Sequence, residues 1–238
     1  FSSGDIPVDA AAYAEVVGTG ATVLHVPFSI GAAAFFHNVP NAPASGLRLS
    51  ACVLADIFNL AITTWDDAQI AALNPELSVP AGQPIKVFRR AFGASTTAGI
   101  TTYLNKACPA KWPSSQVGAT IEWASGTFAA QGVGGMSDAI ASEDYSIGYI
   151  DSGHGNDDGI SEVSIDNLDG TFQTSAESIA RGGVEAAATA ALQAGVLPAD
   201  PTADFSAVTL HNMPGEFTWP IVAISYIYVR ADQTSNGE

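Results

Sequence analysis

The spacing of apolar residues alternates between helical and strand-like patterns along the chain. Apolar positions recur at helical spacing between residues 50 and 58, and Ser50 is a favourable N-cap for that segment. The apolar run 85–89 predicts a strand, and a helical pattern over 96–106 begins directly beyond the loop 91–95. A strand, a glycine-containing loop and a helix in succession are typical of α/β proteins.

The same patterns predict further elements. Residues 23–36 are interpreted as two short strands that flank Pro27, followed by a loop rich in Pro and Asn. Helices are expected at 66–73, near 136–142 and at 177–193, and strands at 121–123, 147–150, 163–165, 171–173, 207–210 and 221–229. The longest apolar runs are far shorter than the roughly 20 residues that cross a bilayer, so no membrane span is predicted.

Charge narrows the possible partners. The 238 residues carry 24 acidic and 8 Lys or Arg side chains, a formal net charge of -16. Binding to nucleic acid depends on a basic surface, so nucleic acid is not expected as a partner. A local anion pocket is still compatible with this charge, because distant charges are screened over about 8–10 Å whereas pocket donors act at contact. The scarcity of Lys favours an extracellular protein.

Two cysteines, Cys52 and Cys108, are too far apart for a CxxC redox or zinc motif. One disulfide and two buried free thiols are both compatible with the sequence. The chain starts at Phe1 without a signal peptide, which is typical of a mature, processed or partial chain.

The basic residues cluster at one place. Lys86, Arg89 and Arg90 lie at the end of the predicted strand, and hydroxyl residues stand at the start of the helix that follows. The first turn of a helix offers unpaired N–H groups and a partial positive charge, which suit an oxyanion. The alternative is that Ser95 or Thr96 caps the helix and that the arginines pair with surface carboxylates.

This loop resembles that of the periplasmic phosphate-binding proteins of ABC transporters, in which Val-x-Arg-Arg-x-Asp-Gly-Ser-Gly-Thr opens a helix ending in Tyr-Leu. Here the matching stretch runs from Val87 to Thr97 and on to Tyr103 and Leu104. Other matches in family order are Leu54-Ala55-Asp56-Ile57-Phe58, Trp65-Asp66-Asp67, Ile70-Ala71-Ala72-Leu73-Asn74-Pro75, Ile147-Gly148-Tyr149 and Trp219-Pro220-Ile221. The resemblance implies a type II periplasmic-binding-protein-like α/β fold.

The resemblance also implies ligand residues. Arg90 matches the arginine that pairs with phosphate, and Thr96 matches a threonine that contacts it. The segment from Phe1 resembles Phe-Gly-Ala-Ser-Asp-x-Pro-Leu, which makes Asp5 the counterpart of the aspartate that accepts a hydrogen bond from protonated phosphate. Such an acceptor-only carboxylate would reject fully deprotonated sulfate.

The match at the loop is incomplete. Ala94 stands where the family has a ligand serine, Ser95 replaces a glycine, and Phe92 replaces the aspartate that orients the arginine. The candidate ligand set is therefore Asp5, Arg90, Ser95 and Thr96.

The resemblance implies one nearly complete lobe and part of a second. Residues 27–205 are expected to form the first, and residues 1–26 and 206–238 part of the other, with chain crossings near Val26-Pro27 and Trp219. The family elements that precede the counterpart of Asp5 have no match here, nor do the C-terminal helices. Either a second polypeptide or a neighbouring copy of the chain completes the partial lobe, or the fold is reduced and its ligand function altered. The first of these, completion by another chain, is the prediction.

Enzyme motifs are not found. The acidic segment 151–158 contains His154, but its spacing fits no standard calcium loop and favours a solvated turn. His25, His37 and His211 are scattered, which favours structural or surface roles. No catalytic, metal or cofactor site is predicted.

The sequence thus predicts a secreted, non-enzymatic phosphate or oxyanion-binding protein that is extracellular, cell-surface or periplasmic. The alternative is a cell-surface structural or assembly module that keeps the fold but has a degraded ligand site. Fold analogy alone does not choose between them.

Overall fold

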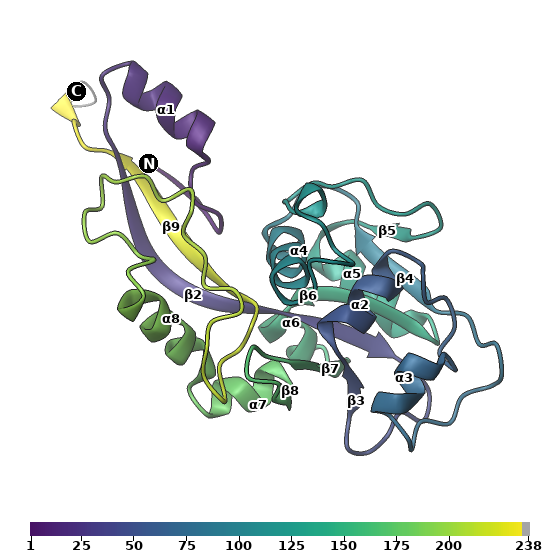
Figure 1. Ribbon diagram of the computed structural model, residues 1–238. Helices are drawn as coiled ribbons and strands as arrows, with labels where there is room; N and C mark the ends of the chain where they lie inside the picture. Colours follow the sequence, from purple (N-terminus) through teal and green to yellow (C-terminus); the bar gives the residue numbers. More distant parts are fainter. Residues whose placement is uncertain (235–238) are drawn as a thin grey trace.

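A long strand, β2 (Val23–Asn38), runs through both ends of the molecule (Figure 1). The computed structural model describes residues 1–234. From Val23 to Ala32 the strand pairs with β9 (Val222–Arg230), and from Ala33 to Asn38 with β6 (Ser146–Asp151), in both cases antiparallel. All the strands therefore belong to one hydrogen-bonded network, in which β2 is shared.

The expectation of two short strands around Pro27 was wrong. The strand continues through the proline, and its register against β9 shifts between Pro27 and Ser29. An extra residue at such a bulge absorbs the missing N–H of proline while the pairing resumes on either side.

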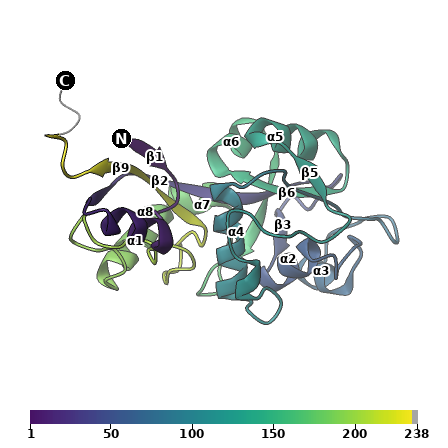
Figure 2. The same cartoon turned by 90° about the horizontal axis from the view of Figure 1, so that it is seen from above.

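The larger end of the molecule is a layered α/β unit. Strand β6 pairs in parallel with β4 (Lys86–Arg90), which pairs in parallel with β5 (Phe128–Ala130). Helix α5 (Gly132–Ser142) covers one face of these strands, and α4 (Ser95–Ala107) with α2 (Ala51–Phe58) lies on the other (Figure 2). Parallel strands need this cover because both of their faces are apolar.

The other elements complete both ends. They are β1 (Ser2–Gly4), α1 (Ala10–Gly18), β3 (Leu47–Leu49), α3 (Ala68–Leu73), a 3-10 turn at Ser114–Gln116, α6 (Ser152–Asp157), β7 (Ser161–Asp166), β8 (Phe172–Gln173), α7 (Ser175–Ala180) and α8 (Gly183–Gln193). Strands β7 and β8, which include the strands predicted at 163–165 and 171–173, pair antiparallel as a hairpin. Strand β1 pairs with β9 at the other end of the molecule, where α1 also lies; this is the smaller end (Figure 1).

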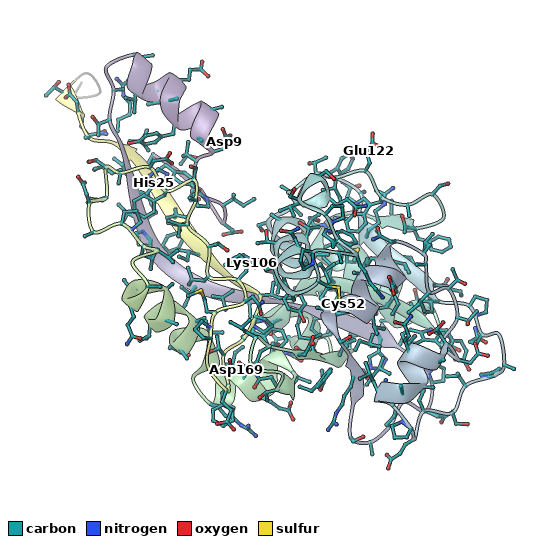
Figure 3. All side chains as sticks on the ribbon, in the orientation of Figure 1. Asp9, His25, Cys52, Lys106, Glu122 and Asp169 are labelled. Atoms are coloured by element: carbon teal, nitrogen blue, oxygen red, sulfur yellow. A yellow bond between two sulfur atoms is a disulfide. The ribbon has the colours of Figure 1, made fainter. Side chains whose placement is uncertain are left out.

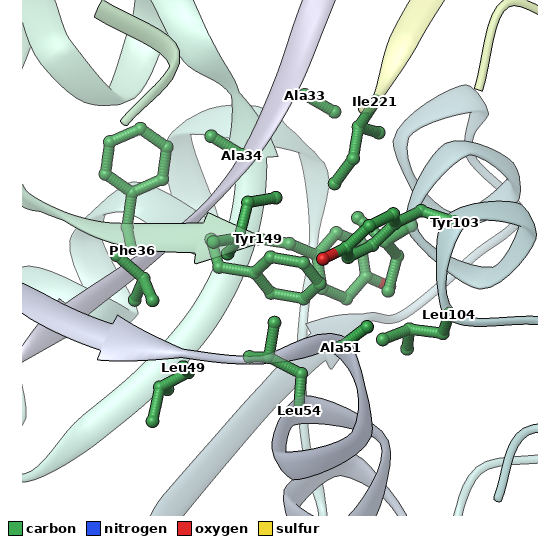
Figure 4. Close-up of a cluster of buried hydrophobic side chains, with 14 of the residues drawn as sticks. Ala33, Ala34, Phe36, Leu49, Ala51, Leu54, Tyr103, Leu104, Tyr149 and Ile221 are labelled. Carbon is green, nitrogen blue, oxygen red and sulfur yellow. The ribbon is translucent and has the colours of Figure 1, made fainter. Parts of the chain in front are cut away.

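Large side chains fill the space between the sheet and α2 and α4 (Figure 4). Tyr103 of α4 and Tyr149 of β6 are both fully buried. The hydroxyl of Tyr103 donates to the backbone carbonyl of Asp166 at 2.8 Å, so this polar group is not left unpaired. This core fixes the position of α4 against the sheet.

Local capping and strand signals were reliable. The Ser50 hydroxyl accepts from the Val53 N–H at 3.4 Å at the start of α2, and β4 and α4 lie where expected.

Other local predictions were wrong. Residues 121–123 and 207–210 are not strands, and 177–193 divides into two helices because Gly182 adopts a φ of 73°. The expected turn at 151–158 contains the short helix α6.

The two cysteines form a disulfide, which resolves the alternative left open by the sequence. Cys52 of α2 is joined to Cys108, the residue that ends α4, with a Cα–Cα distance of 5.3 Å (Figure 3). The bond links positions 56 residues apart. Closing a loop of this length stabilises a native fold by about 2–4 kcal/mol.

The smaller end is built from segments far apart in the sequence. The His25 N–H donates to the carbonyl of Pro201 at 2.9 Å, and its ring stacks on Phe205. The pairing partner of β2 changes at Ala32–Ala33, a few residues beyond the expected crossing near Pro27. The division into one lobe at 27–205 and a partial lobe at 1–26 and 206–238 stays a prediction. The last four residues of the partial lobe, 235–238, lie outside the described residues.

None of the helices within residues 1–234 combines the length and the apolar character that crossing a membrane requires.

Candidate functional site

The candidate site lies at the carboxyl end of β4, where the chain turns into α4. In open α/β sheets this edge is where ligands bind. The Ala91 N–H donates to Ala130 and the Ala94 N–H to Ala119, at 2.9 and 3.0 Å. A Cβ on Gly93 would lie 2.5 Å from the Thr120 hydroxyl, so only glycine fits there without a shift. The loop is therefore held closely against its neighbours.

The start of α4 is not capped by a side chain. Ala94 occupies the N-cap position and makes no side-chain hydrogen bond. The capping role considered for Ser95 or Thr96 is therefore not observed, because both residues lie inside the first turn. The first-turn N–H groups keep the partial positive charge that attracts anions.

The backbone of Arg90 is fixed by a hydrogen bond, whereas its side chain has no acidic partner among the described residues. Its N–H donates to the Tyr149 hydroxyl at 3.2 Å, and that hydroxyl also bonds to Thr97 at 2.8 Å. Within residues 1–234 neither Arg89 nor Arg90 has a carboxylate oxygen within 4.0 Å. The Arg90 Nε is buried without a hydrogen-bond partner. The alternative interpretation, in which the arginines pair with surface carboxylates, is thus not observed in the described part of the chain.

Asp5 joins three distant segments. Its carboxylate accepts a hydrogen bond from Ser95 Oγ at 3.2 Å and from Ser225 Oγ at 2.7 Å. The first of these residues begins α4 and the second lies in β9. Asp5 is therefore placed at the entrance to the helix start even though it lies 90 residues from Ser95.

A pocket of about 90 Å³, here called the α4 pocket, opens at this junction, and Asp5, Ser95, Thr96, Asp151 and Ser225 contribute to its lining. Thr96 is only 5% exposed, and its hydroxyl has no hydrogen-bond partner. A buried hydroxyl without a partner is costly, so this atom is available for a ligand.

Three of the four candidate residues, Asp5, Ser95 and Thr96, thus lie around one pocket. Arg90 does not line it, but its charge acts on Asp151, which does. That these four residues bind an anion stays a prediction.

Three polar residues of the pocket were missed by sequence reasoning: Asp151, Ser225 and His211, the last of which was assigned a structural or surface role. Asp151 follows the predicted strand 147–150, and the ends of neighbouring parallel strands meet at one edge of a sheet, so the topology could have indicated it. Ser225 gives no such signal, because its position depends on the register of β9 against β2.

Burial and neighbouring charges shift the pKa of the Asp151 carboxyl. Partial desolvation and then the negative charge of Asp5 raise the pKa of the Asp151 carboxyl, while Arg90 and His154 act in the opposite direction. Its side chain remains open to solvent, which places it at the rim of the pocket.

A larger pocket of about 280 Å³ adjoins the first and shares Asp5, Ser95 and His211 with it. It is lined mainly by apolar residues such as Ile6, Leu210 and Ile224.

Within residues 1–234 no group of three His, Cys, Asp or Glu side chains could hold a metal ion.

The elements described above form an α/β fold of the type II periplasmic-binding class. A model described as a PBP superfamily domain matches residues 1–234, and the chain belongs to this family.

Curated relatives match nearly the whole of this chain. The phosphate-binding protein PstS of Pasteurella multocida is 31% identical over 228 residues, which cover 95% of this chain and 61% of that protein. PstS of Xylella fastidiosa is 32% identical over 232 residues, 97% of this chain and 58% of its own length. The chain therefore spans about three fifths of these relatives.

Solved structures share the fold. A DING protein matches with a TM-score of 0.69 at 20% identity, covering 99% of this chain and 68% of its own. A periplasmic phosphate-binding protein, PfluDING, solved with bound phosphate, matches with a TM-score of 0.67 at 21% identity over 98% of this chain and 66% of its own. At these identities the likeness concerns the fold, which agrees with the fold class predicted from the sequence.

Proposed function

We propose that this chain belongs to a non-enzymatic phosphate-binding protein that captures phosphate, or a related oxyanion, at the start of α4. The observation that carries the proposal is the Thr96 hydroxyl, which is buried and unpartnered at an uncapped helix start. The helix N–H groups and Arg90 supply positive charge, and Asp5 supplies an acceptor for a protonated oxyanion. Relatives that carry the name phosphate-binding protein support the choice of ligand.

The proposed location is extracytoplasmic: extracellular, cell-surface or periplasmic. The disulfide between Cys52 and Cys108 supports this location, because disulfides persist in oxidising compartments. The net charge of -16 gives no support for nucleic acid as a partner.

Thr96→Val tests the proposal, because valine keeps the shape and removes the hydroxyl. We expect phosphate affinity, measured by calorimetry, to fall about tenfold or more, since a hydrogen bond to a charged group contributes about 1.5–3 kcal/mol. Without ligand, the free energy of unfolding should stay the same or rise, because an unsatisfied buried group is lost.

The matched control is Thr189→Val, on an exposed part of α8 where the hydroxyl donates only to Glu185. It should leave phosphate affinity unchanged. If wild type binds no phosphate at millimolar concentration, the proposal is rejected in favour of the alternative, a surface module with a degraded ligand site.

We also propose that a further polypeptide segment of the same precursor completes the smaller end. Within residues 1–234, β2 pairs with a strand on only one edge between Phe28 and Ala32. Val26, Phe28 and Ile30 are 41%, 58% and 39% exposed. Open edges with apolar side chains recruit another strand, and the relatives are longer than this chain.

Native mass spectrometry of material purified from its natural source tests this second proposal. We expect a further segment or a second polypeptide bound to the chain. When the chain is expressed alone it should self-associate, and Phe28→Lys should reduce that association more than Leu168→Lys, which alters an exposed leucine in the β7–β8 turn. One monomeric native species with the mass of this chain would contradict the proposal.

A further inference from the structure

Two carboxylates face the α4 pocket. Asp5 comes from the N-terminal segment, and Asp151 stands at the end of β6, immediately before α6. A pocket for an anion gains nothing from two negative charges unless a proton separates them from the bound oxygens. The presence of both carboxylates therefore restricts which anions the pocket can accept.

The two carboxylates differ in their surroundings. Both oxygens of Asp5 accept hydrogen bonds, from Ser95 and Ser225. Asp151 caps no N–H of α6, and its side chain forms no ion pair within residues 1–234. It can therefore turn an oxygen toward a ligand without breaking a contact with another residue.

A second observation points to a ligand at the same place. The Thr96 hydroxyl lines this pocket, its residue is 5% exposed, and it has no hydrogen-bond partner. An anion that accepted from Thr96 and from the first-turn N–H groups would present its remaining oxygens to the two carboxylates.

We infer that Asp151 is a second specificity-determining residue of the α4 pocket, which admits oxyanions that carry O–H groups and rejects fully deprotonated ones such as sulfate. The inference rests on the proposed function. An O–H of the ligand donates to the Asp151 carboxylate, whereas sulfate oxygens meet it with two like charges and no proton between them. Asp151 therefore selects for a protonated ligand oxygen, in addition to the selection that Asp5 makes.

Acidification relieves this exclusion. Asp151 takes up a proton more readily than an ordinary aspartate, and its O–H then donates to a sulfate oxygen. The charged and titratable groups around it are Asp5, Arg90 and His154, and His211 lines the same pocket with burial lowering its pKa to about 4. Sulfate affinity should therefore increase as pH falls toward the acidic range, and the carboxyl of Asp151 should contribute to this increase.

Asp151→Asn tests the inference, because asparagine has the same shape, carries no charge and can donate. Wild type and variant are titrated calorimetrically with inorganic phosphate and with sulfate between pH 5 and pH 8. We expect the phosphate-over-sulfate affinity ratio at pH 8 to fall about tenfold in the variant, and the rise of sulfate affinity on acidification to be smaller than in wild type.

The control is Asp157→Asn, which removes the same charge from an exposed position of α6 outside the pocket lining. It should keep the wild-type ratio. If Asp151→Asn also keeps the wild-type ratio and pH dependence while wild type binds phosphate, the inference is wrong and the proposed function stands. If wild type binds no phosphate, both are rejected.

Discussion

Arg90→Ala should remove most of the phosphate affinity of the protein. The Arg90 Nε is buried without a partner, and within residues 1–234 no carboxylate lies within 4.0 Å to neutralise the guanidinium. A bound anion would take that role, and truncating one member of a buried, hydrogen-bonded charge pair costs about 2–5 kcal/mol. Calorimetric titration with phosphate should therefore show a loss of about thirtyfold or more.

A control variant distinguishes the loss of the contact between Arg90 and the anion from the general effect of removing one positive charge. Arg181 lies at 4.8 Å over the ring of Phe217, away from the α4 pocket. Arg181→Ala changes the net charge equally and should alter phosphate affinity by less than about threefold, because distant charges are screened. Equal affinities for wild type and Arg90→Ala would place the anion elsewhere.

The protein should lose stability as pH falls from about 6.5 to 4. Burial lowers the pKa of His37 to about 4, and burial together with Lys106 does the same for His211. The unfolded chain binds these protons at pH values where the folded chain does not, so protonation favours unfolding. The stabilisation present above pH 6.5 is lost toward pH 4, about 3 kcal/mol for each histidine at most.

Urea unfolding at a series of pH values measures this dependence. Burial raises the pKa of Glu162, which works in the opposite direction in the acidic range, so a variant is needed to isolate the histidine. His37→Gln should flatten the decline of the free energy of unfolding between pH 6.5 and 4. His154→Gln, which removes an exposed histidine of α6, should not flatten it, and an unchanged decline in His37→Gln would contradict the assignment.

Local signals predicted much of the larger end from the sequence. The N-cap at Ser50 and the strand, loop and helix around Arg90 depend on residues close in sequence, so their patterns were sufficient. The continuous β2 could not be predicted in this way, because β9 and β6 hold it from opposite ends of the chain. Likewise β1 pairs with a strand more than 200 residues away, and no local pattern indicates that pairing.

The candidate site was predicted in part for the same reason. Ser95 and Thr96 follow from the helix start, whereas Asp5 was indicated by the family resemblance rather than by its local pattern. Ser225 and Asp151 reach the pocket through strand pairing, which requires the tertiary fold. Contacts between residues far apart in the sequence therefore could not be predicted from local sequence patterns.

A crystal structure of the protein grown with phosphate tests the central claim most directly. We expect density for one tetrahedral anion in the α4 pocket, within hydrogen-bond distance of the Thr96 hydroxyl and with an oxygen facing the carboxylate of Asp5, and we expect the Arg90 side chain to turn toward this anion from outside the present lining. A pocket without an anion at saturating phosphate, or an anion bound away from the start of α4, would contradict it.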